Sequence, residues 1–182
     1  VHRVIVTMPA DLVEAATASM PGATIVAGGE TRQQSAVAGL EEIGDDEALV
    51  LIHDVTRPFV SGAIIDRCLE ALLTHDAVGT VVDSVDTVYR VQSGDRGTEL
   101  IDIPDRGSIR RAQTPQGFRC GVIRDAHRLA AEADDDATDD CSVVLRHRPD
   151  VRIALVAGDE RNVKLTTAAD FAGARRDIDA AR

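Results

Sequence analysis

The sequence has few cysteines and no long apolar run, and both absences narrow the kinds of protein it can be. Cys68, Cys120 and Cys141 are odd in number, widely spaced and without a Cys-x-x-Cys pair, so they indicate neither a disulfide framework nor a zinc site. No apolar stretch approaches the roughly 18 to 20 residues that cross a bilayer, and the first residues do not read as a signal peptide. We therefore expect a soluble, cytoplasmic protein that does not bind membranes.

Positive charge is also scarce. Lysine and arginine number 20 against 31 aspartates and glutamates, which gives a formal net charge of −11. We therefore do not expect a broad electrostatic surface for nucleic acid or an anionic membrane. If the ligands are anionic, the basic residues that bind them must be few and individually placed.

The chain is long enough for one domain with a substantial core. Nothing in the composition divides its 182 residues, so we treat 1–182 as a single domain. The chain opens with Val1 and not with Met, and residues 1–7 already have the pattern of a buried strand. From this start we expect the domain to be N-terminally incomplete.

Apolar runs and amphipathic stretches alternate along the chain. Short runs rich in β-branched residues predict strands at 4–6, 23–26, 48–52, 78–82 and 151–156. Amphipathic stretches predict helices at about 9–18, 32–42, 61–74, 120–132, 139–147 and 168–180. This alternation predicts an α/β fold in which a mostly parallel sheet has helices on both faces.

One segment, residues 83–116, breaks the alternation. Two strand-like pieces at 87–91 and 98–103 flank the turn-forming stretch 93–97, which predicts a β-hairpin. A hairpin inserted in an α/β domain is expected to project from it as an arm. Because the apolar side of such an arm must be buried, we predict a homodimer formed through residues 83–116.

A glycine-containing turn follows the second predicted strand. Gly28 and Gly29 allow a ligand to approach the backbone, and Arg32 and Ser35 lie at the start of the helix that follows. The free N–H groups of a helix N-terminus can receive an anion or a polar base edge. An ordinary strand-to-helix turn with a surface arginine remains the alternative.

A second polar segment, His53 to Phe59, follows the third predicted strand. Ligands of open α/β sheets bind at the carboxyl ends of the strands, so Asp54 is placed to hold Mg²⁺ and Arg57 to hold a phosphate. The alternative is a salt-bridged loop in which Asp54 caps the next turn. We assign no chemistry to His53.

Later polar residues are individually weak signals. Thr87 lies on the outgoing strand of the arm, while Arg106 and Thr114 lie on the segment that returns from it. Thr138 precedes a helix, where its hydroxyl is a reasonable phosphate ligand, while the neighbouring aspartates are typical of a solvated face and a helix cap. Lys164 follows the last predicted strand, where a lone lysine is usually a surface residue.

The order and spacing of these motifs together resemble the methylerythritol phosphate and ribitol phosphate cytidylyltransferase family. The Gly-Gly-x-x-Arg-x-x-Ser turn and the His-Asp-x-x-Arg-Pro segment of that family are similar to residues 28–35 and 53–58. Its arm threonine, its arginine eight residues before a Thr-Pro-Gln threonine, and that threonine correspond to Thr87, Arg106 and Thr114. Its later Thr-Asp-(Asp/Glu) and Asn-Ile-Lys motifs correspond to residues 138–140 and 162–164.

The resemblance implies a Rossmann-like nucleotidyltransferase. It would transfer CMP from CTP to a polyol phosphate, either 2-C-methyl-D-erythritol 4-phosphate or D-ribitol 5-phosphate, with Mg²⁺ or another divalent cation. Gly28, Gly29, Arg32 and Ser35 would receive the nucleotide, Lys164 would steady the α-phosphate, and Asp54 would hold the metal or the substrate hydroxyls. The polyol phosphate would be bound by a set of basic and hydroxyl residues: Arg57, Thr87, Arg106, Thr114 and Thr138. The resemblance also implies that Thr87 and Arg106 serve the site of the neighbouring protomer.

One departure from the family pattern carries an expectation of its own. Family members begin with a strand and an Ala-Gly-Gly-x-Gly-x-Arg loop that wraps the triphosphate of CTP, and these 182 residues do not contain it. We therefore expect the 182 residues alone to be nearly inactive. Two further hypotheses stay open, namely a catalytically impaired, dimeric nucleotide-binding or structural remnant of the family and an unrelated α/β binding domain.

Overall fold

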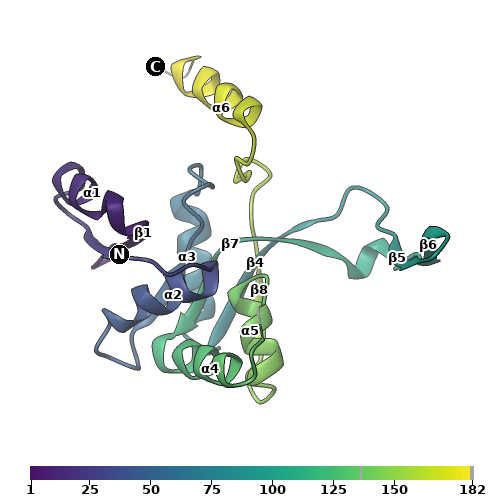
Figure 1. Ribbon diagram of the computed structural model, residues 1–182, viewed down its shortest axis with the longest axis horizontal. Coiled ribbons are helices and arrows are strands. Elements are labelled where there is room, and N and C mark those ends of the chain that lie inside the picture. Colours follow the sequence, from purple (N-terminus) through teal and green to yellow (C-terminus); the bar gives the residue numbers. More distant parts are fainter. Residues whose placement is uncertain (136, 181–182) are drawn as a thin grey trace.

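The computed structural model describes residues 1–135 and 137–180 and has a four-stranded sheet at its centre (Figure 1). The strands lie in the order β3 (Leu49–Ile52), β7 (Arg110–Arg119), β4 (Ala77–Asp83) and β8 (Ile153–Ala157). β7 is antiparallel to both of its neighbours, whereas β4 and β8 are parallel. It follows that β3, β4 and β8 run in one direction and that their carboxyl ends share one edge of the sheet.

A second, two-stranded sheet forms from the start of the chain. β1 (Ile5–Met8) and β2 (Thr24–Ala27) pair in parallel and are joined by a 3₁₀ turn (Ala10–Leu12) and α1 (Val13–Ser19). α2 (Arg32–Glu41) follows β2 and packs against β1. The strands predicted at 4–6 and 23–26 are therefore confirmed.

Helices cover both faces of the central sheet. α3 (Gly62–Ala71) packs on one face, where Ile64 and Cys68 meet Val78. α4 (Cys120–Glu132) and α5 (Asp140–His147) pack on the other face. Ala77 belongs to this second cluster although Val78 belongs to the first, because successive side chains of a strand point to opposite faces.

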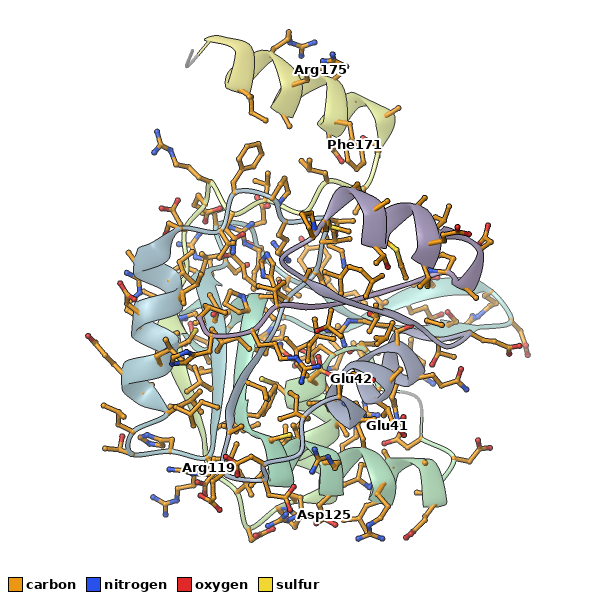
Figure 2. All side chains as sticks on the ribbon, turned by 90° about the vertical axis from the view of Figure 1, so that its left-hand side faces the viewer. Glu41, Glu42, Arg119, Asp125, Phe171 and Arg175 are labelled. Atoms are coloured by element: carbon orange, nitrogen blue, oxygen red, sulfur yellow. The ribbon has the colours of Figure 1, made fainter. Side chains whose placement is uncertain are left out.

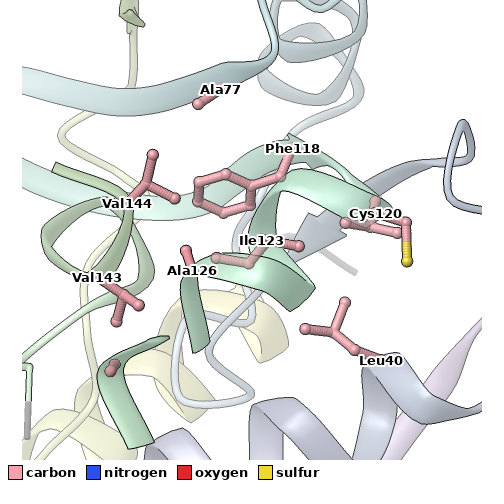
Figure 3. Packing of buried hydrophobic residues seen from close by; sticks show 10 residues of the cluster. Leu40, Ala77, Phe118, Cys120, Ile123, Ala126, Val143 and Val144 are labelled. Carbon is pink, nitrogen blue, oxygen red and sulfur yellow. The ribbon is translucent and has the colours of Figure 1, made fainter. Parts of the chain in front are cut away.

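The larger core cluster surrounds Phe118. Figure 3 shows its ring between Ile123 of α4 and Val144 of α5, and all three residues are fully enclosed. Leu40 brings the end of α2 into the same cluster, so α2 is attached to the central sheet through α4. These contacts fix the relative positions of the loops at the carboxyl edge of the sheet.

The predicted arm is present and projects from the body (Figure 1). β5 (Arg90–Gly94) and β6 (Gly97–Asp102) form an antiparallel hairpin in which every residue is exposed. The exposed apolar residues of the arm are Val85, Val88, Tyr89, Val91, Leu100, Ile101 and Ile103. The hairpin prediction is confirmed, with the first strand beginning later than expected.

The last helix stands apart from the body. α6 (Ala168–Ala180) is at the top of Figure 1, and Figure 2 shows Phe171 and Arg175 on it. Phe171 is 54% exposed. Among the residues that the structure describes, no helix is both long enough and apolar enough to cross a membrane.

β7 is the element that the sequence did not predict. Its middle carries the polar residues Gln113, Thr114 and Gln116, in the segment that we expected to return from the arm and to which we assigned no strand. All three are at most 5% exposed, and each of them makes hydrogen bonds to residues outside β7. Their polarity is therefore compatible with a central strand.

Candidate functional site

Charged side chains from distant segments meet at the edge of the sheet where β3 and β8 end. Asp54 follows β3, Lys164 lies beyond β8, and Arg32 opens α2. Lys164 Nζ is 3.0 Å from Asp54 Oδ2, and Arg32 Nε is 3.4 Å from Asp54 Oδ1. One carboxylate thus pairs with two cations that lie far apart in the sequence.

Asp54 is held in its ionised form. Burial alone would raise its pKa, but the hydrogen bond and charge of Lys164, and then those of Arg32, lower the pKa below its ordinary value. The side chain of Asp54 is 16% exposed, whereas that of Lys164 is 46% exposed. An ammonium group has three N–H donors, so Lys164 keeps donors that can reach an anionic ligand.

β7 fixes the loops that carry these charges. Gln113 Nε2 donates to the carbonyl of Asp159 at 2.8 Å, in the segment that follows β8. Thr114 Oγ1 accepts the backbone N–H of Asp54 at 3.0 Å. Neighbouring side chains of one rigid strand therefore set the relative positions of two loops of the site.

The hydroxyl of Thr114 is also bonded to His53. His53 Nδ1 is 3.0 Å from Thr114 Oγ1, and its Nε2 is 2.9 Å from the carbonyl oxygen of Arg57. A carbonyl can only accept, so Nε2 carries the proton and Nδ1 accepts from the threonine hydroxyl. His53 thus links the two ends of the 53–57 loop to each other and to β7.

Two bonds attach the Lys164 segment to the same loop. The N–H of Leu165 donates to the carbonyl of Thr56 at 2.8 Å. Arg57 Nη1 donates to the carbonyl of Asn162 at 2.7 Å. Lys164 lies between these two anchors, so its approach to Asp54 is set by the backbone.

The turn at 28–35 is shaped by close approach of the chain to itself. Thr31 caps α2 through a capping box with Gln34. A Cβ atom at Gly28 would lie 2.6 Å from Ser35 Oγ, and one at Gly29 would lie 2.3 Å from Gln34 Cβ. A side chain at Gly29 would therefore clash with the first turn of α2, whereas one at Gly28 would require the Ser35 side chain to turn away.

Two grooves meet at this turn. One has a volume of 490 Å³ and runs between β1 and β3, with Ile5, Leu51 and Asp54 among its lining residues. The other has a volume of 540 Å³ and is lined by the turn, including Gly28 and Gly29. Arg32 and Ser35 line both grooves. A ligand that enters either groove therefore meets the start of α2.

These features occur in a chain with a clear family match. Residues 1–178 match the IspD family, 2-C-methyl-D-erythritol 4-phosphate cytidylyltransferase. The chain belongs to this family. The match confirms the resemblance to the cytidylyltransferase family that we inferred from the motifs. The hypothesis of an unrelated α/β binding domain is wrong.

Two curated proteins show which enzymes the chain is similar to. It is 47% identical over 152 residues to the 2-C-methyl-D-erythritol 4-phosphate cytidylyltransferase of Thermobifida fusca, covering 81% of this chain and 61% of that protein. It is 33% identical over 149 residues to the bifunctional ribulose 5-phosphate reductase/CDP-ribitol pyrophosphorylase Bcs1 of Haemophilus influenzae, covering 81% of this chain and 31% of that protein. The chain thus spans less than two thirds of the length of these curated relatives.

A solved structure of the IspD family has the same fold. The crystal structure of 4-diphosphocytidyl-2C-methyl-D-erythritol synthase from Anaerococcus prevotii superposes with a TM-score of 0.89 at 26% identity, covering 98% of this chain and 79% of that chain. The prediction of a Rossmann-like α/β fold is thereby confirmed.

The residues predicted for an IspD-type site fall into two groups. Arg32, Asp54 and Lys164 form the charged cluster, and Arg57, Thr114 and the turn with Gly28, Gly29 and Ser35 surround it. Thr87, Arg106 and Thr138 are exposed outside the cluster. Arg106 Nη1 donates to the carbonyl of Val85 at 3.2 Å, within the segment that leads into the arm. The roles of these residues stay predictions.

One expectation about the acidic residues near 138 was wrong. We expected a solvated face and a helix cap, and Asp139 does cap α5 by accepting the N–H of Ser142. Asp140, however, is 0% exposed and is bonded to Arg32 and His127. His127 lies on the apolar face of α4, with Ile123 and Ala130 one turn away, and this placement was the only sequence signal for it.

The donors around Asp54 do not form a metal site of their own. Among residues 1–135 and 137–180, no group of three or more His, Cys, Asp or Glu side chains is arranged to hold a metal ion. Each oxygen of Asp54 already faces a cation, Arg32 or Lys164. A metal ion held by Asp54 would have to displace or repel these cations, so we derive no step through it.

Asp140 should make the stability of the fold depend on pH. Burial alone would raise its pKa, but hydrogen bonds from His127 and Arg32 lower the pKa below its ordinary value. A lowered pKa in the folded state stabilises the fold above the unfolded pKa, and this contribution is lost as the pH falls through the folded pKa.

We expect Asp140→Asn to lower the free energy of unfolding by about 2 kcal/mol at pH 7, and by progressively less as the pH falls below the ordinary aspartate pKa of about 4. Urea unfolding across this range measures the difference. A destabilisation that is the same at every pH would show that Asp140 is not the titrating group.

Thr114→Val separates two roles of the threonine hydroxyl. Removing the hydroxyl leaves the N–H of Asp54 without its partner, which is expected to lower the free energy of unfolding by about 1 to 2 kcal/mol. The exposed Thr74, changed to Val, serves as the control. Unchanged stability with a raised KM for the polyol phosphate would instead assign the hydroxyl to the substrate alone.

Proposed function

We propose that the protein carrying this chain transfers CMP from CTP to 2-C-methyl-D-erythritol 4-phosphate and releases pyrophosphate. The family match over residues 1–178 and the 47% identity to the Thermobifida fusca enzyme support this activity. The observation that carries the proposal is the meeting of Lys164 and Arg32 at Asp54, on the edge where open α/β sheets bind ligands. The two cations come from segments that are far apart in the sequence, and one of them, Lys164, keeps a side chain that is 46% exposed.

D-Ribitol 5-phosphate is the second candidate acceptor. The Haemophilus influenzae relative, named a CDP-ribitol pyrophosphorylase in part, is 33% identical over 149 residues. The lower identity makes ribitol phosphate the second choice. Both acceptors present the same reacting group, a phosphate on the terminal carbon of a polyol.

The chemistry is an in-line displacement between anions. An oxygen of the polyol phosphate forms a bond to the α-phosphorus of CTP, while the bond from that phosphorus to the bridging oxygen breaks and pyrophosphate leaves. A phosphate oxygen is already a nucleophile, so the residues have to position the reactants and neutralise charge. Lys164 is the group proposed to contact the α-phosphate, because its side chain is 46% exposed and its ammonium group is held by Asp54.

The remaining roles are divided between nucleotide and acceptor. We assign the turn with Gly28, Gly29 and Ser35 to the nucleotide, since it lines both grooves through Ser35. We assign the acceptor phosphate to Thr138 and to the arm residues Thr87 and Arg106. The guanidinium of Arg57 donates to the backbone carbonyls of Asn162 and Ala112, and Thr114 accepts the backbone N–H of Asp54. We therefore assign both residues to holding the loops that carry Asp54 and Lys164.

A divalent cation is proposed to arrive with the nucleotide. Mg²⁺ in nucleotide enzymes is commonly bound by one or two carboxylates together with substrate phosphates. In that arrangement the phosphates of CTP supply most of the ligands. We also place the protein in the cytoplasm, because the cysteines of the described chain are free thiols.

We propose that two copies associate through the arm. Its apolar residues are exposed in a single chain, among them Leu100, which is 52% exposed, and Tyr89, which is 60% exposed. A two-fold pair of arms would bury these side chains against each other or against the partner's body. Arg106 would then reach the site of the neighbouring copy.

Mixing two inactive variants tests this sharing of the site. In a heterodimer of Lys164→Gln and Arg106→Ala, one site combines both defects and the other site is intact. Random exchange of subunits should therefore restore about a quarter of the wild-type activity. If Arg106 serves its own subunit, each site keeps one defect and mixing restores nothing.

The activity itself is tested by release of pyrophosphate. The protein that carries this chain is given CTP with each polyol phosphate in turn, and with a hexose 1-phosphate as the control acceptor. We expect release with 2-C-methyl-D-erythritol 4-phosphate or D-ribitol 5-phosphate and none with the control. Good release with the hexose 1-phosphate and none with either polyol phosphate would refute the proposal.

A further inference from the structure

A row of alternating charges, Asp140, Arg32, Asp54 and Lys164, runs from the core to the site, and His127 backs its inner end. Buried His127 contacts Asp140, with Nε2 at 3.1 Å from Oδ1. Asp140 Oδ2 is 2.7 Å from Arg32 Nη2, and Arg32 continues the row to Asp54 and Lys164. The row therefore connects α4 and α5, which belong to the core, with the groups proposed to act on the nucleotide.

The inner end of the row is rigid. The side chains of His127 and Asp140 are 2% and 0% exposed. A carboxylate can only accept, so Nε2 of His127 carries the proton that is donated to Asp140. Nδ1 of His127 has no hydrogen-bond partner among the described residues. A proton on Nδ1 would be a buried, unpaired N–H donor, which is costly, so Nδ1 carries a lone pair and no proton.

The backbone around Asp140 is fixed by β7. Gln116 Nε2 donates to Asp139 Oδ2 at 2.6 Å, and Gln116 Oε1 accepts the N–H of Cys141 at 3.0 Å. Gln116 is itself 2% exposed. Asp140 lies between these two contacts, so neither its main chain nor its side chain is free to follow Arg32.

Arg32 is shared unequally between its two carboxylates. Arg32 Nη2 lies 2.7 Å from Asp140 Oδ2, whereas Arg32 Nε lies 3.4 Å from Asp54 Oδ1. The tighter bond holds the guanidinium towards the core. Asp54 is left with its closer contact to Lys164, at 3.0 Å.

From this geometry we infer that Asp140, backed by His127, is a positioning residue that restrains Arg32 and so keeps Asp54 paired with Lys164. The inference rests on the proposed function, because Lys164 is the group assigned to the α-phosphate. Arg32 serves the reaction by holding Asp54, and Asp140 acts through Arg32 without touching the substrate. If Arg32 were released, it would move onto Asp54 and compete with Lys164 for the same carboxylate.

Two pairs of variants test this inference in the protein that carries the chain. Asp140→Asn leaves one acceptor oxygen for two donors, and Asp150→Asn makes the same change at a residue that is 65% exposed and paired with Arg148. His127→Leu removes the donor to Asp140, whereas His127→Gln keeps an N–H donor. The His127 pair decides the question if Asp140→Asn does not fold.

Catalysis by folded protein is the first readout. We expect Asp140→Asn and His127→Leu to lower kcat about tenfold with KM for CTP nearly unchanged, since misplaced charges mainly affect the transition state. His127→Gln and Asp150→Asn should keep most of the wild-type kcat. In an Arg32→Met background, Asp140→Asn should have no further effect, because the two residues act as one unit. Unchanged kcat in Asp140→Asn and His127→Leu, or full additivity with Arg32→Met, would overturn the inference.

The second readout does not depend on turnover. Lys164 is the only lysine of the 182 residues. In lysine-labelled protein its ¹³Cε signal is identified as the one that Lys164→Arg removes. We expect this signal to move in Asp140→Asn and His127→Leu and to stay in place in His127→Gln and Asp150→Asn. A protein that shows these shifts but transfers no CMP would refute the proposed function and leave the charge row intact. A signal that stays in place in all four variants would overturn the inference, whatever the activity.

Discussion

Replacing Lys164 with glutamine is expected to lower kcat/KM for CTP by about 10² to 10³-fold in the protein that carries this chain. Two anions must approach each other in the proposed reaction, and Lys164 is the half-exposed cation at the edge of the sheet. A preorganised donor of this kind commonly contributes roughly 3 to 4 kcal/mol to transition-state stabilisation. Glutamine keeps a polar side chain but loses the charge.

The matched control for Lys164→Gln is Arg111→Gln. Arg111 is also a half-exposed cation paired with a carboxylate, since its side chain is 48% exposed and lies 2.5 Å from Glu160. Arg111→Gln should change kcat/KM for CTP by less than about threefold, because an exposed ion pair contributes little to the stability of the fold. Equal losses in the two variants would mean that overall charge, and not the position of Lys164, governs activity.

Asp54→Asn is expected to lower kcat by about 10²-fold. Asparagine keeps the backbone N–H that Thr114 accepts, so the loop should stay in place. It loses the charge that holds Lys164 and Arg32 together, and the two cations then repel each other. Steady-state kinetics measure the loss, and Asp83→Asn, at a residue paired with Arg110 and 82% exposed, is the control.

The double variant Asp54→Asn/Lys164→Gln shows whether the pair acts as a unit. Groups that act together give losses that do not add. We expect the double variant to be only slightly slower than the slower single variant. Losses that multiply in full would show that Asp54 and Lys164 act independently.

Much of the fold followed from local sequence patterns. The apolar runs at 48–52 and 78–82 became β3, at the edge of the central sheet, and β4, which lies between β7 and β8. Both runs are rich in Val, Leu and Ile, which favour strands that pack against helices. The arm followed from the turn-forming residues between two β-rich pieces, and the observed hairpin turns at Asp95 and Arg96. In both cases the information lies within a few neighbouring residues.

The unpredicted features depend on partners that are distant in the sequence. Gln113 and Gln116 are polar and so give no apolar strand pattern, and it is their bonds to other segments that allow them to lie in a central strand. The bond between Arg32 and Asp140 joins residues that are 108 positions apart. Two adjacent aspartates in an acidic chain are usually solvated, so the burial of Asp140 follows only from its tertiary partners, Arg32 and His127.

The fate of a labelled α-phosphate tests the central claim most directly. The protein that carries this chain would be incubated with CTP labelled at the α-phosphorus and with 2-C-methyl-D-erythritol 4-phosphate or D-ribitol 5-phosphate. The predicted result is label in a CDP-polyol and unlabelled pyrophosphate, with this transfer lost in Lys164→Gln and kept in Arg111→Gln. Label that appears only in CMP, or that forms a CDP-polyol equally well without Lys164, would contradict the proposed site.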